Sequence, residues 1–139
     1  MPRTVQTIIN VVQNDLCLHG DVRSSKYWDY VEAAENDFFR CVGIPEHEVY
    51  ARYILPRIAV RLDSIAPAYL DDALEITTHV SRISTSTFNF AFDIKRQDTA
   101  EHIAKAEVVI CCVDEQGSSR PLPDELLAWL QPFLAEDAR

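Results

Sequence analysis

Three side chains that can take part in acyl transfer alternate within one short segment of the sequence. Cys17, His19 and Asp21 are each separated by one residue, and alternate residues of an extended segment point to the same side. Three chemical roles follow from this arrangement. His19 could be a general base that activates water while Asp21 fixes its tautomer. Alternatively, Asp21 is itself the base or nucleophile, or Cys17 is a thiolate nucleophile beside His19.

The same segment also has purely structural interpretations. A cysteine such as Cys17 is more often a small buried apolar side chain than a nucleophile, and Asp15 can accept hydrogen bonds from nearby loop amides. Arg23 is suited to bind a phosphate or a carboxylate, but most arginines of this kind are simply exposed. Gly20 is one of only 3 glycines in the chain, so we expect a turn there that requires it.

A helix is predicted to begin directly after this segment. Ser24 or Ser25 is expected to cap it. The amides of Val22, Arg23 and Ser24 then form its first turn, where unpaired N–H groups and the positive end of the helix dipole suit a developing oxyanion. This oxyanion site depends on no particular side chain.

One apolar stripe with a spacing of three or four residues defines the body of this helix. Its members are Tyr27, Val31, Ala34, Phe38 and Cys41. Gly43 and Pro45 predict its end. The acidic residues Asp29, Glu32 and Glu35 are expected on its solvated face.

Strands are predicted on both sides of the helix. Residues 5–12 are rich in β-branched side chains, and after the helix the apolar period changes from 3.6 to 2. Further strands are predicted at 58–63, 74–81, 88–95 and 103–113, and a short C-terminal helix begins at Pro123. This order predicts an α+β fold in which a curved antiparallel sheet wraps around one long helix. We expect a single domain over residues 1–139, and because sheet edges are left uncovered we expect an oligomer built on a dimer.

Composition excludes several classes of function. The chain carries 13 Lys and Arg against 22 Asp and Glu, a net charge of -9, which disfavours binding to nucleic acid or to an anionic membrane. No apolar run approaches the roughly 20 residues needed to span a bilayer, and the polar N-terminus does not resemble a signal peptide. We therefore expect a cytoplasmic protein with free cysteines. The cysteine spacing fits no zinc site, and the few glycines exclude the usual nucleotide-binding loops; no metal or cofactor is expected.

Four segments in this order resemble the hotdog-fold thioesterases, specifically the 4-hydroxybenzoyl-CoA thioesterase-like branch. The loop 14–27 is similar to the family pattern D-x-D-x-x-G-H-V-N-N-x-x-Y, and 66–76 is similar to A-P-A-x-x-G-D-x-L-x-V. The helix over 27–40 and the segment 112–123 complete the resemblance, which covers about residues 5–133. It implies a hotdog fold, no cofactor, and hydrolysis of a thioester of coenzyme A or of acyl carrier protein.

The resemblance also assigns roles to individual residues. In the family, the loop supplies a catalytic carboxylate and the helix N-terminus supplies an N–H group that polarises the carbonyl. Asp15 matches the first Asp of the pattern, Cys17 matches the usual catalytic Asp, and Asp21 matches the family His. Some members from polyketide pathways also lack the acid at the position of Cys17. Related branches carry a catalytic carboxylate on the helix, for which Glu32 or Asp29 is the candidate here.

The sequence therefore predicts a thioesterase for an acyl-CoA or acyl-carrier-protein substrate, possible acyl groups being polyketide or β-substituted chains. Its catalytic candidates are Cys17, His19, Asp21 and Glu32. The residues expected to form the oxyanion site or to bind substrate are Asp15, Gly20, Val22, Arg23, Ser24 and Tyr27. The alternatives are a dehydratase or hydratase acting on a β-hydroxyacyl thioester and a non-catalytic module that binds acyl thioesters. The expected assembly is a homodimer or a tetramer formed by two dimers.

Overall fold

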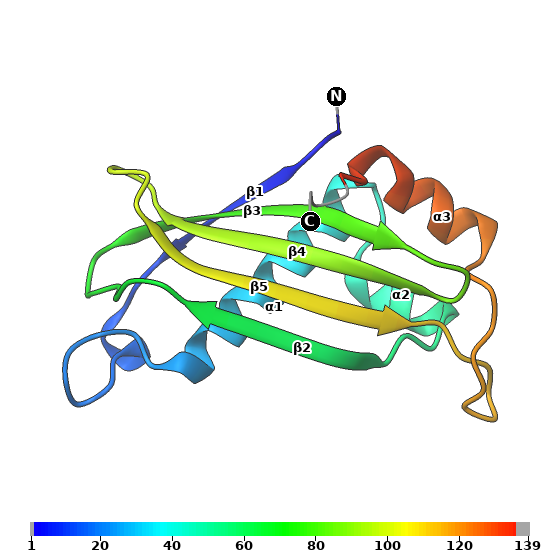
Figure 1. Cartoon of the computed structure of the whole chain (residues 1–139), viewed down its shortest axis with the longest axis horizontal. Helices are drawn as coiled ribbons and strands as arrows, with labels where there is room; N and C mark the ends of the chain where they lie inside the picture. Colours follow the sequence, from blue (N-terminus) through cyan, green and yellow to red (C-terminus); the bar gives the residue numbers. More distant parts are fainter. Residues whose placement is uncertain (1, 136–139) are drawn as a thin grey trace.

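One long helix lies across a curved antiparallel sheet in this computed structural model, which describes residues 2–135 (Figure 1). The sheet has five strands in the order β1-β3-β4-β5-β2. The strands are β1 (Val5–Asn10), β2 (Arg57–Ser64), β3 (Ala73–Ile83), β4 (Thr87–Arg96) and β5 (His102–Cys111). The helices are α1 (Ser24–Cys41), α2 (Glu46–Arg52) and α3 (Asp124–Leu130), with short 3₁₀ turns η1 (Gln13–Asp15) and η2 (Gln131–Phe133). The α+β arrangement predicted from the sequence is confirmed.

The core forms between α1 and the face of the sheet that it covers. On β4 the apolar side chains alternate with polar ones, and Phe88, Phe90 and Phe92 are buried on the helix side. Phe38 of α1 packs on this row, with its ring centroid 4.8 Å from that of Phe90. Phe133 of η2 closes the same cluster at 4.7 Å from Phe38. The apolar face of β4, which repeats every two residues, and the apolar face of α1, which follows the helical period, thus pack together in one aromatic layer.

The end of α1 follows the predicted signals. Gly43 has a φ of +94°, and its N–H donates to the carbonyl of Arg40 at 3.1 Å. The next amide, that of Ile44, donates to the carbonyl of Phe39 at 3.0 Å. Glycine is the residue that tolerates this left-handed conformation, so it ends the helix. Cys41 is exposed, which corrects its place in the predicted apolar stripe, because the side chains that the last turn of α1 buries are those of Phe38 and Phe39.

Several elements differ from the prediction in their presence or their bounds. The helix α2 was not expected, because it is short and contributes only one buried residue, Val49, too few to produce a recognisable period. The first strand ends at Asn10 and β5 ends at Cys111, two residues earlier than predicted in each case. The C-terminal helix begins after Pro123 as predicted and buries Leu126 and Leu130.

The two edge strands of the sheet are β1 and β2 (Figure 1). Along β2 no residue is fully buried, and the apolar side chains of Ile58 and Val60 are 59% and 55% exposed. Such an edge leaves backbone donors and acceptors open for pairing. Among residues 2–135, no helix combines the length and the apolar character that crossing a bilayer requires.

Candidate active site

The segment before α1 folds back on itself as a small hairpin. Leu16 and Val22 form an isolated antiparallel bridge, the Cys17 N–H donates to the carbonyl of Asp21 at 2.8 Å, and the Gly20 N–H donates to the carbonyl of Cys17 at 3.0 Å. Gly20 has a φ of +89°, which a residue with a side chain rarely adopts. The turn expected at Gly20 is therefore present, and we call residues 16–22 the site hairpin.

The site hairpin brings Cys17 and Asp21 together. The Cys17 thiol donates to Oδ1 of Asp21 over 2.8 Å. This bond and the bond from the residue's own backbone amide lower the pKa of Asp21, assisted by the charge of nearby His19 and opposed by desolvation. Asp21 is therefore a carboxylate at neutral pH, and Cys17 acts as a hydrogen-bond donor to it.

His19 does not complete a triad with these two residues. It lies at the exposed tip of the site hairpin, and among residues 2–135 it makes no hydrogen bond with Asp21 or Cys17. The predicted convergence of three alternate residues fails because the chain turns between Cys17 and Asp21, so these two face each other across the hairpin and His19 lies at its end. Within residues 2–135, no hydrogen bond supports the interpretations in which Asp21 holds His19 or His19 activates Cys17.

We expect Cys17→Ala to change the pH dependence of any activity that needs the Asp21 carboxylate. Removing the largest cause of the lowered pKa raises the pKa of Asp21 toward its ordinary value, so the fraction of carboxylate falls at a higher pH than in the wild type. The acid limb of kcat/KM should move to higher pH, while the plateau at neutral pH is retained. Cys41→Ala, at an exposed cysteine, is the matched control. An unchanged acid limb would contradict the coupling.

Asp15 has a structural role below the site hairpin. It is buried, and its Oδ2 accepts from the Val12 N–H at 3.0 Å and from the Tyr30 hydroxyl at 2.8 Å. Lys26 lies 3.8 Å from the other carboxylate oxygen. Burial, and then this bond to Asp15, raises the pKa of Tyr30. The interpretation of Asp15 as an acceptor for loop amides is thus the one that the contacts favour, with α1 fastened to the same carboxylate.

The start of α1 leaves fewer free amides than predicted. Arg23 is the N-cap and not Ser24 or Ser25. The Val22 N–H donates to the carbonyl of Ala68 at 2.9 Å, and the Arg23 N–H donates to the carbonyl of Asp15 at 3.0 Å. Because these two amides hold the loops together, they cannot also bind an oxyanion. Within the described part of the chain, the Ser24 N–H has no such partner, so it is the amide that remains for the predicted oxyanion site.

The remaining predicted substrate residues surround this point. Arg23 is exposed, and its guanidinium donates to the carbonyl of Asn14, which holds the preceding turn. Tyr27 is buried on the first full turn of α1. Burial and the charge of Asp21 raise the pKa of Tyr27 to about 12. Its hydroxyl is therefore protonated at neutral pH and lies in the electrostatic field of the Asp21 carboxylate.

A second loop supports the site hairpin. The Val22 N–H bond to Ala68 and a bridge between Asp21 and Tyr69 join the hairpin to residues 66–72, which we call the support loop. Asp72 then links the support loop to the residue directly after β1, because its carbonyl accepts from the Val11 N–H at 2.9 Å. The position of Asp21 thus depends on the position of the support loop.

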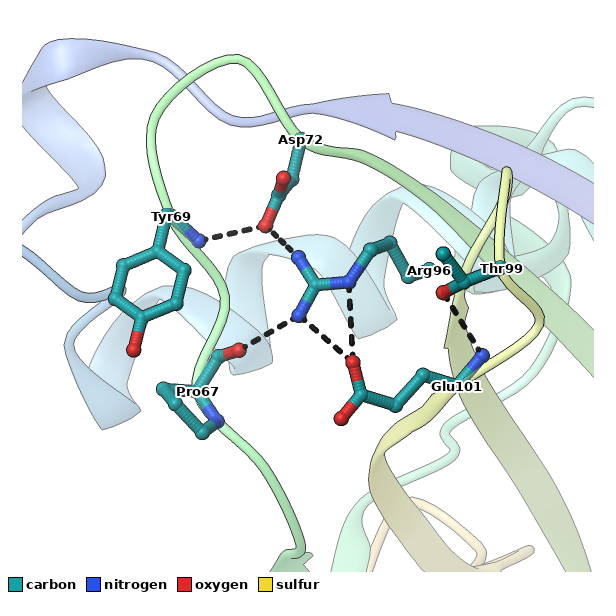
Figure 2. A network of polar contacts seen from close by, with 6 residues as sticks. All are labelled: Pro67, Tyr69, Asp72, Arg96, Thr99 and Glu101. Atoms are coloured by element: carbon teal, nitrogen blue, oxygen red, sulfur yellow. Dashed lines mark hydrogen bonds and ion pairs between the residues drawn. The ribbon is translucent and has the colours of Figure 1, made fainter.

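Figure 2 shows what fixes the support loop: the guanidinium of Arg96, at the end of β4, contacts three groups at once. It donates to the carboxylate of Asp72, to the carbonyl of Pro67 at 3.1 Å, and to Glu101 at 3.1 and 3.3 Å. The Asp72 carboxylate also accepts from the Tyr69 N–H at 2.8 Å. A planar guanidinium can hold several acceptors in a defined geometry, so this one side chain connects β4 to the support loop.

The family follows from comparison with known proteins. The model of the Thioesterase-like superfamily matches residues 11–130, which is most of the chain. The chain belongs to this superfamily. The matched region includes the site hairpin, α1 and the support loop.

Three individual proteins show how far this thioesterase-like chain resembles its relatives. It is 30% identical over 79 residues to a 1,4-dihydroxy-2-naphthoyl-CoA hydrolase of Synechococcus elongatus, covering 56% of this chain and 57% of that protein. The crystal structure of a 1,4-dihydroxy-2-naphthoyl-CoA thioesterase from Synechocystis superposes with a TM-score of 0.86 at 18% identity, covering 93% and 96% of the two chains. A 4-hydroxybenzoyl CoA thioesterase superposes with a TM-score of 0.79 at 18% identity, covering 91% and 98%. The hotdog fold implied by the sequence resemblance is confirmed.

The thioesterase-like chain also contains a buried ion pair that the sequence did not reveal. Glu35 was expected on the solvated face of α1 but is 0% exposed. It accepts two bonds from Nη2 of Arg57 at the start of β2, one of them 2.6 Å long. Burial raises the pKa of Glu35, and Arg57 opposes that shift. A signal was present: Glu35 lies four residues from both Val31 and Phe39, which are buried on the same side of the helix.

Glu32 differs from its neighbour Glu35. It is exposed on α1, and it lines two hollows between α1, α2 and β2. The structure does not bring it to the site hairpin, and Asp29 is occupied by an ion pair with Lys26 at 3.3 Å. The candidate carboxylate that lies in the site hairpin, directly before α1, is that of Asp21. Among residues 2–135, no group of three or more potential metal ligands lies together.

Proposed function

We propose that this protein hydrolyses the thioester of an acyl-CoA or acyl-carrier-protein substrate, and that Asp21 is the carboxylate that promotes attack on the carbonyl. The observation that carries the proposal is the position of an ionised Asp21 three residues before the free Ser24 amide at the start of a long helix. Membership in the Thioesterase-like superfamily supports the reaction class. The polyketide or β-substituted acyl groups considered above remain candidates for the substrate.

The proposed steps balance as follows. A water molecule transfers a proton to the Asp21 carboxylate while its oxygen bonds to the thioester carbon. The carbonyl oxygen gains negative charge, which the Ser24 N–H and the positive end of the α1 dipole stabilise. The C–S bond then breaks, the proton passes from Asp21 to the leaving sulfur, and a carboxylic acid and a free thiol are released. A direct attack by Asp21 on the carbonyl carbon is the variant of this mechanism in which the carboxylate acts as nucleophile.

Release of free thiol from a panel of acyl-CoA and acyl-carrier-protein thioesters tests this function. The panel contains short and long aliphatic, aromatic, β-hydroxy and 1,4-dihydroxy-2-naphthoyl groups, the last because relatives carry that activity in their names. We expect thiol and carboxylic acid to appear in equal amounts for at least one member. Loss of water from the β-hydroxyacyl thioester with the C–S bond intact would instead indicate a dehydratase. Tight binding without turnover would indicate a non-catalytic acyl-binding module.

We further propose that the protein acts in the cytoplasm and that two copies associate through the β2 edge. This edge exposes backbone groups together with Ile58 and Val60, which is the kind of surface that a partner strand covers. The mass of the assembly in solution distinguishes this dimer from a tetramer formed by two dimers.

Light scattering should therefore give the mass of an assembly with an even number of chains. Ile58→Lys should weaken the dimer at least about tenfold, or 1.4 kcal/mol, since a charged edge residue opposes strand pairing. Ile65→Lys, at a residue that is 53% exposed just beyond β2, is the matched control. A wild-type monomer, or equal weakening by both variants, would contradict association through β2.

A further inference from the structure

The face of the sheet turned away from α1 carries a cluster of charged side chains. Figure 1 shows this face in front, with α1 behind the strands. A hollow of about 380 Å³ lies in it, and every residue that lines the hollow belongs to β2, β3, β4 or β5. The charged or titratable side chains of the lining are Arg61, Asp63, His79, Asp93, Lys105 and Glu107. We call this surface the outer face.

The strand register arranges these side chains in two rows that run across the sheet. In the first row, the residues of β3, β4, β5 and β2 are Thr77, Asp93, Lys105 and Asp63. In the second row, the residues of the same strands are His79, Ala91, Glu107 and Arg61. Residues i and i+2 of a strand lie on the same side, so both rows belong to the outer face. On β5 and on β2 the two rows carry opposite charges.

This pattern is complementary to itself. A two-fold axis that lies in the plane of the sheet and crosses the strands between the rows brings the first row of one copy over the second row of another. Lys105 of each copy then faces Glu107 of the other, and Asp63 of each copy faces Arg61 of the other. An isologous interface requires such self-complementarity, and a face whose two rows had the same charge on β5 would repel its own copy.

The hollow fits the same arrangement. Its lining includes Ala91, which has the smallest side chain of the second row. Two residues further along β4, the first row carries the longer side chain of Asp93. The two-fold axis that pairs the charges on β5 also places Asp93 of one copy over the hollow at Ala91 of the other. A depression and a projecting side chain therefore meet on β4.

Lys105 has a charge that a single copy leaves without a partner. It is exposed between Asp93 of β4 and Asp63 of β2, but within residues 2–135 its ammonium group makes no ion pair or hydrogen bond. Both neighbouring carboxylates have other contacts, because Asp93 lies 3.2 Å from His102 and Asp63 accepts from Arg61 at 3.0 Å. A carboxylate from a second molecule can therefore take this place.

The outer face is large enough for a specific contact. Its five strands, about 4.8 Å apart and about 27 Å long, present roughly 650 Å² in each copy. Two copies bury about 1,300 Å² in total, above the roughly 1,000 Å² expected of a biological interface. Facing sheets cross at about 30°, so the rows overlie one another best near the middle of the sheet. The pairs between Lys105 and Glu107 on β5 are therefore expected to decide the association.

We propose that the outer face is an interface between two copies of this chain, in which Lys105 of each copy binds Glu107 of the other across a two-fold axis. The β2 edge lies in the plane of the sheet, so both contacts can form together, and the assembly is then a tetramer of two dimers. The inference depends neither on the thioesterase activity nor on the β2 contact, because the outer face doubles the number of chains in either case.

Reversing one charge on β5 should separate the two faces. Glu107→Lys places two lysines opposite each other, and Lys105→Glu places two glutamates opposite each other, and like charges across an interface oppose association. Each variant should raise the Kd of the outer-face contact at least about tenfold. Light scattering at concentrations between the two Kd values should then give half the wild-type mass. Added salt should weaken the wild-type contact as well, because it screens exposed charges.

Mixing the two variants should restore the contact. In an equimolar mixture of Glu107→Lys and Lys105→Glu proteins, each lysine on β5 can face a glutamate, so the wild-type mass should return. A variant that simply fails to fold cannot produce this recovery. Glu115→Lys changes the net charge by the same amount as Glu107→Lys, at an exposed position in the turn after β5, and it should keep the wild-type mass.

Several results would overturn the inference. These are a wild-type mass that neither charge reversal changes, an equal loss of mass in Glu115→Lys, and a mixture that stays at half mass although thermal melts show both variants folded. If a reversal unfolds the chain, Glu107→Gln and Lys105→Met remove the charges without repulsion, and an unchanged Kd for both then overturns the inference. None of these results concerns thiol release, so failure of the interface and failure of the proposed function are distinguishable.

Discussion

Asp21→Asn should lower kcat/KM for thioester hydrolysis by roughly 10²–10⁴, the range that a positioned general acid or base contributes. Asparagine keeps the shape of the side chain and can still contact Cys17, but it cannot accept a proton from water or attack a carbonyl. The measurement is thiol release under conditions where the wild type turns over, together with a thermal melt to show that folding is unchanged. The loss should appear in kcat, since the carboxylate acts on the reacting atoms.

Asp71→Asn is the matched control for this substitution. Asp71 lies in the support loop, is exposed, and has a φ of +67°, a conformation that asparagine also tolerates. Its replacement should leave the rate within a few-fold of the wild type. A loss of less than tenfold for Asp21→Asn, or an equal loss for both variants, would remove Asp21 from the mechanism.

Isotope labelling of the wild-type reaction separates the two roles of the carboxylate, nucleophile and base. If Asp21 is the nucleophile and water then attacks the aspartyl carbon of the acyl-enzyme anhydride, hydrolysis in ¹⁸O-labelled water under single turnover leaves the first product unlabelled and places the label in the aspartate. If Asp21 is a base, the label enters the product acid in every turnover. An unlabelled first product therefore assigns the nucleophilic mechanism, and both results are consistent with the proposed function.

Arg96→Met is the second substitution with a large expected effect. Within residues 2–135 its guanidinium makes no hydrogen bond with Asp21, and it joins β4 to the support loop through Asp72, Pro67 and Glu101. Without it, the support loop and the site hairpin that leans on it can shift, and a displacement of about 1 Å in a reactive group can cost on the order of 10²-fold in rate. We expect kcat to fall by roughly ten- to a hundredfold while the Kd for a non-hydrolysable acyl-CoA analogue changes much less.

Two comparisons show whether Arg96 acts by positioning. Arg96→Lys should recover little of the rate, because an ammonium group cannot hold Asp72, Pro67 and Glu101 in one plane. Arg82→Met, at an exposed arginine of the neighbouring strand β3, should be silent. Positioning through the support loop is contradicted if Arg96→Met loses stability and activity in parallel. It is also contradicted if both the rate and the pH dependence set by Asp21 are unchanged.

The framework of the fold was predictable from the sequence because its signals are periodic. The alternation on β4 and the stripe from Tyr27 to Phe38 each repeat several times, so each element supports its own assignment. Gly43 added a sharp end to α1. By contrast, α2 offers one buried residue, Val49, and a single apolar position has no period to detect.

The candidate site was predictable only in part because it depends on how segments turn and meet. The rule that alternate residues share a side placed Cys17, His19 and Asp21 together, but the turn at Gly20 leaves His19 at the tip and pairs the other two. The amides of Val22 and Arg23 were predicted to belong to the oxyanion site, but they donate to the carbonyls of Ala68 and Asp15 instead.

Contacts between distant segments are the part that a single sequence does not contain. Nothing in the local sequence around Arg96 indicates that it pairs with Asp72, or that Arg57 reaches Glu35. The burial of Glu35 could be inferred from its spacing to Val31 and Phe39, yet the cation that makes this burial tolerable comes from a strand that begins well beyond the helix. Such pairs become visible only when the sheet order is known.

The place of β2 in the sheet has a consequence for how the protein assembles and opens. β2 comes before β3, β4 and β5 in the sequence, yet it pairs only with β5, so it cannot dock until the last strand of the chain is in place. A strand that pairs on one side and buries little apolar surface is also the one that detaches at the lowest free-energy cost from the native state. In an isolated chain β2 is therefore the part of the sheet that yields first, and pairing with a second copy along this edge would make the docking of β2 depend on assembly.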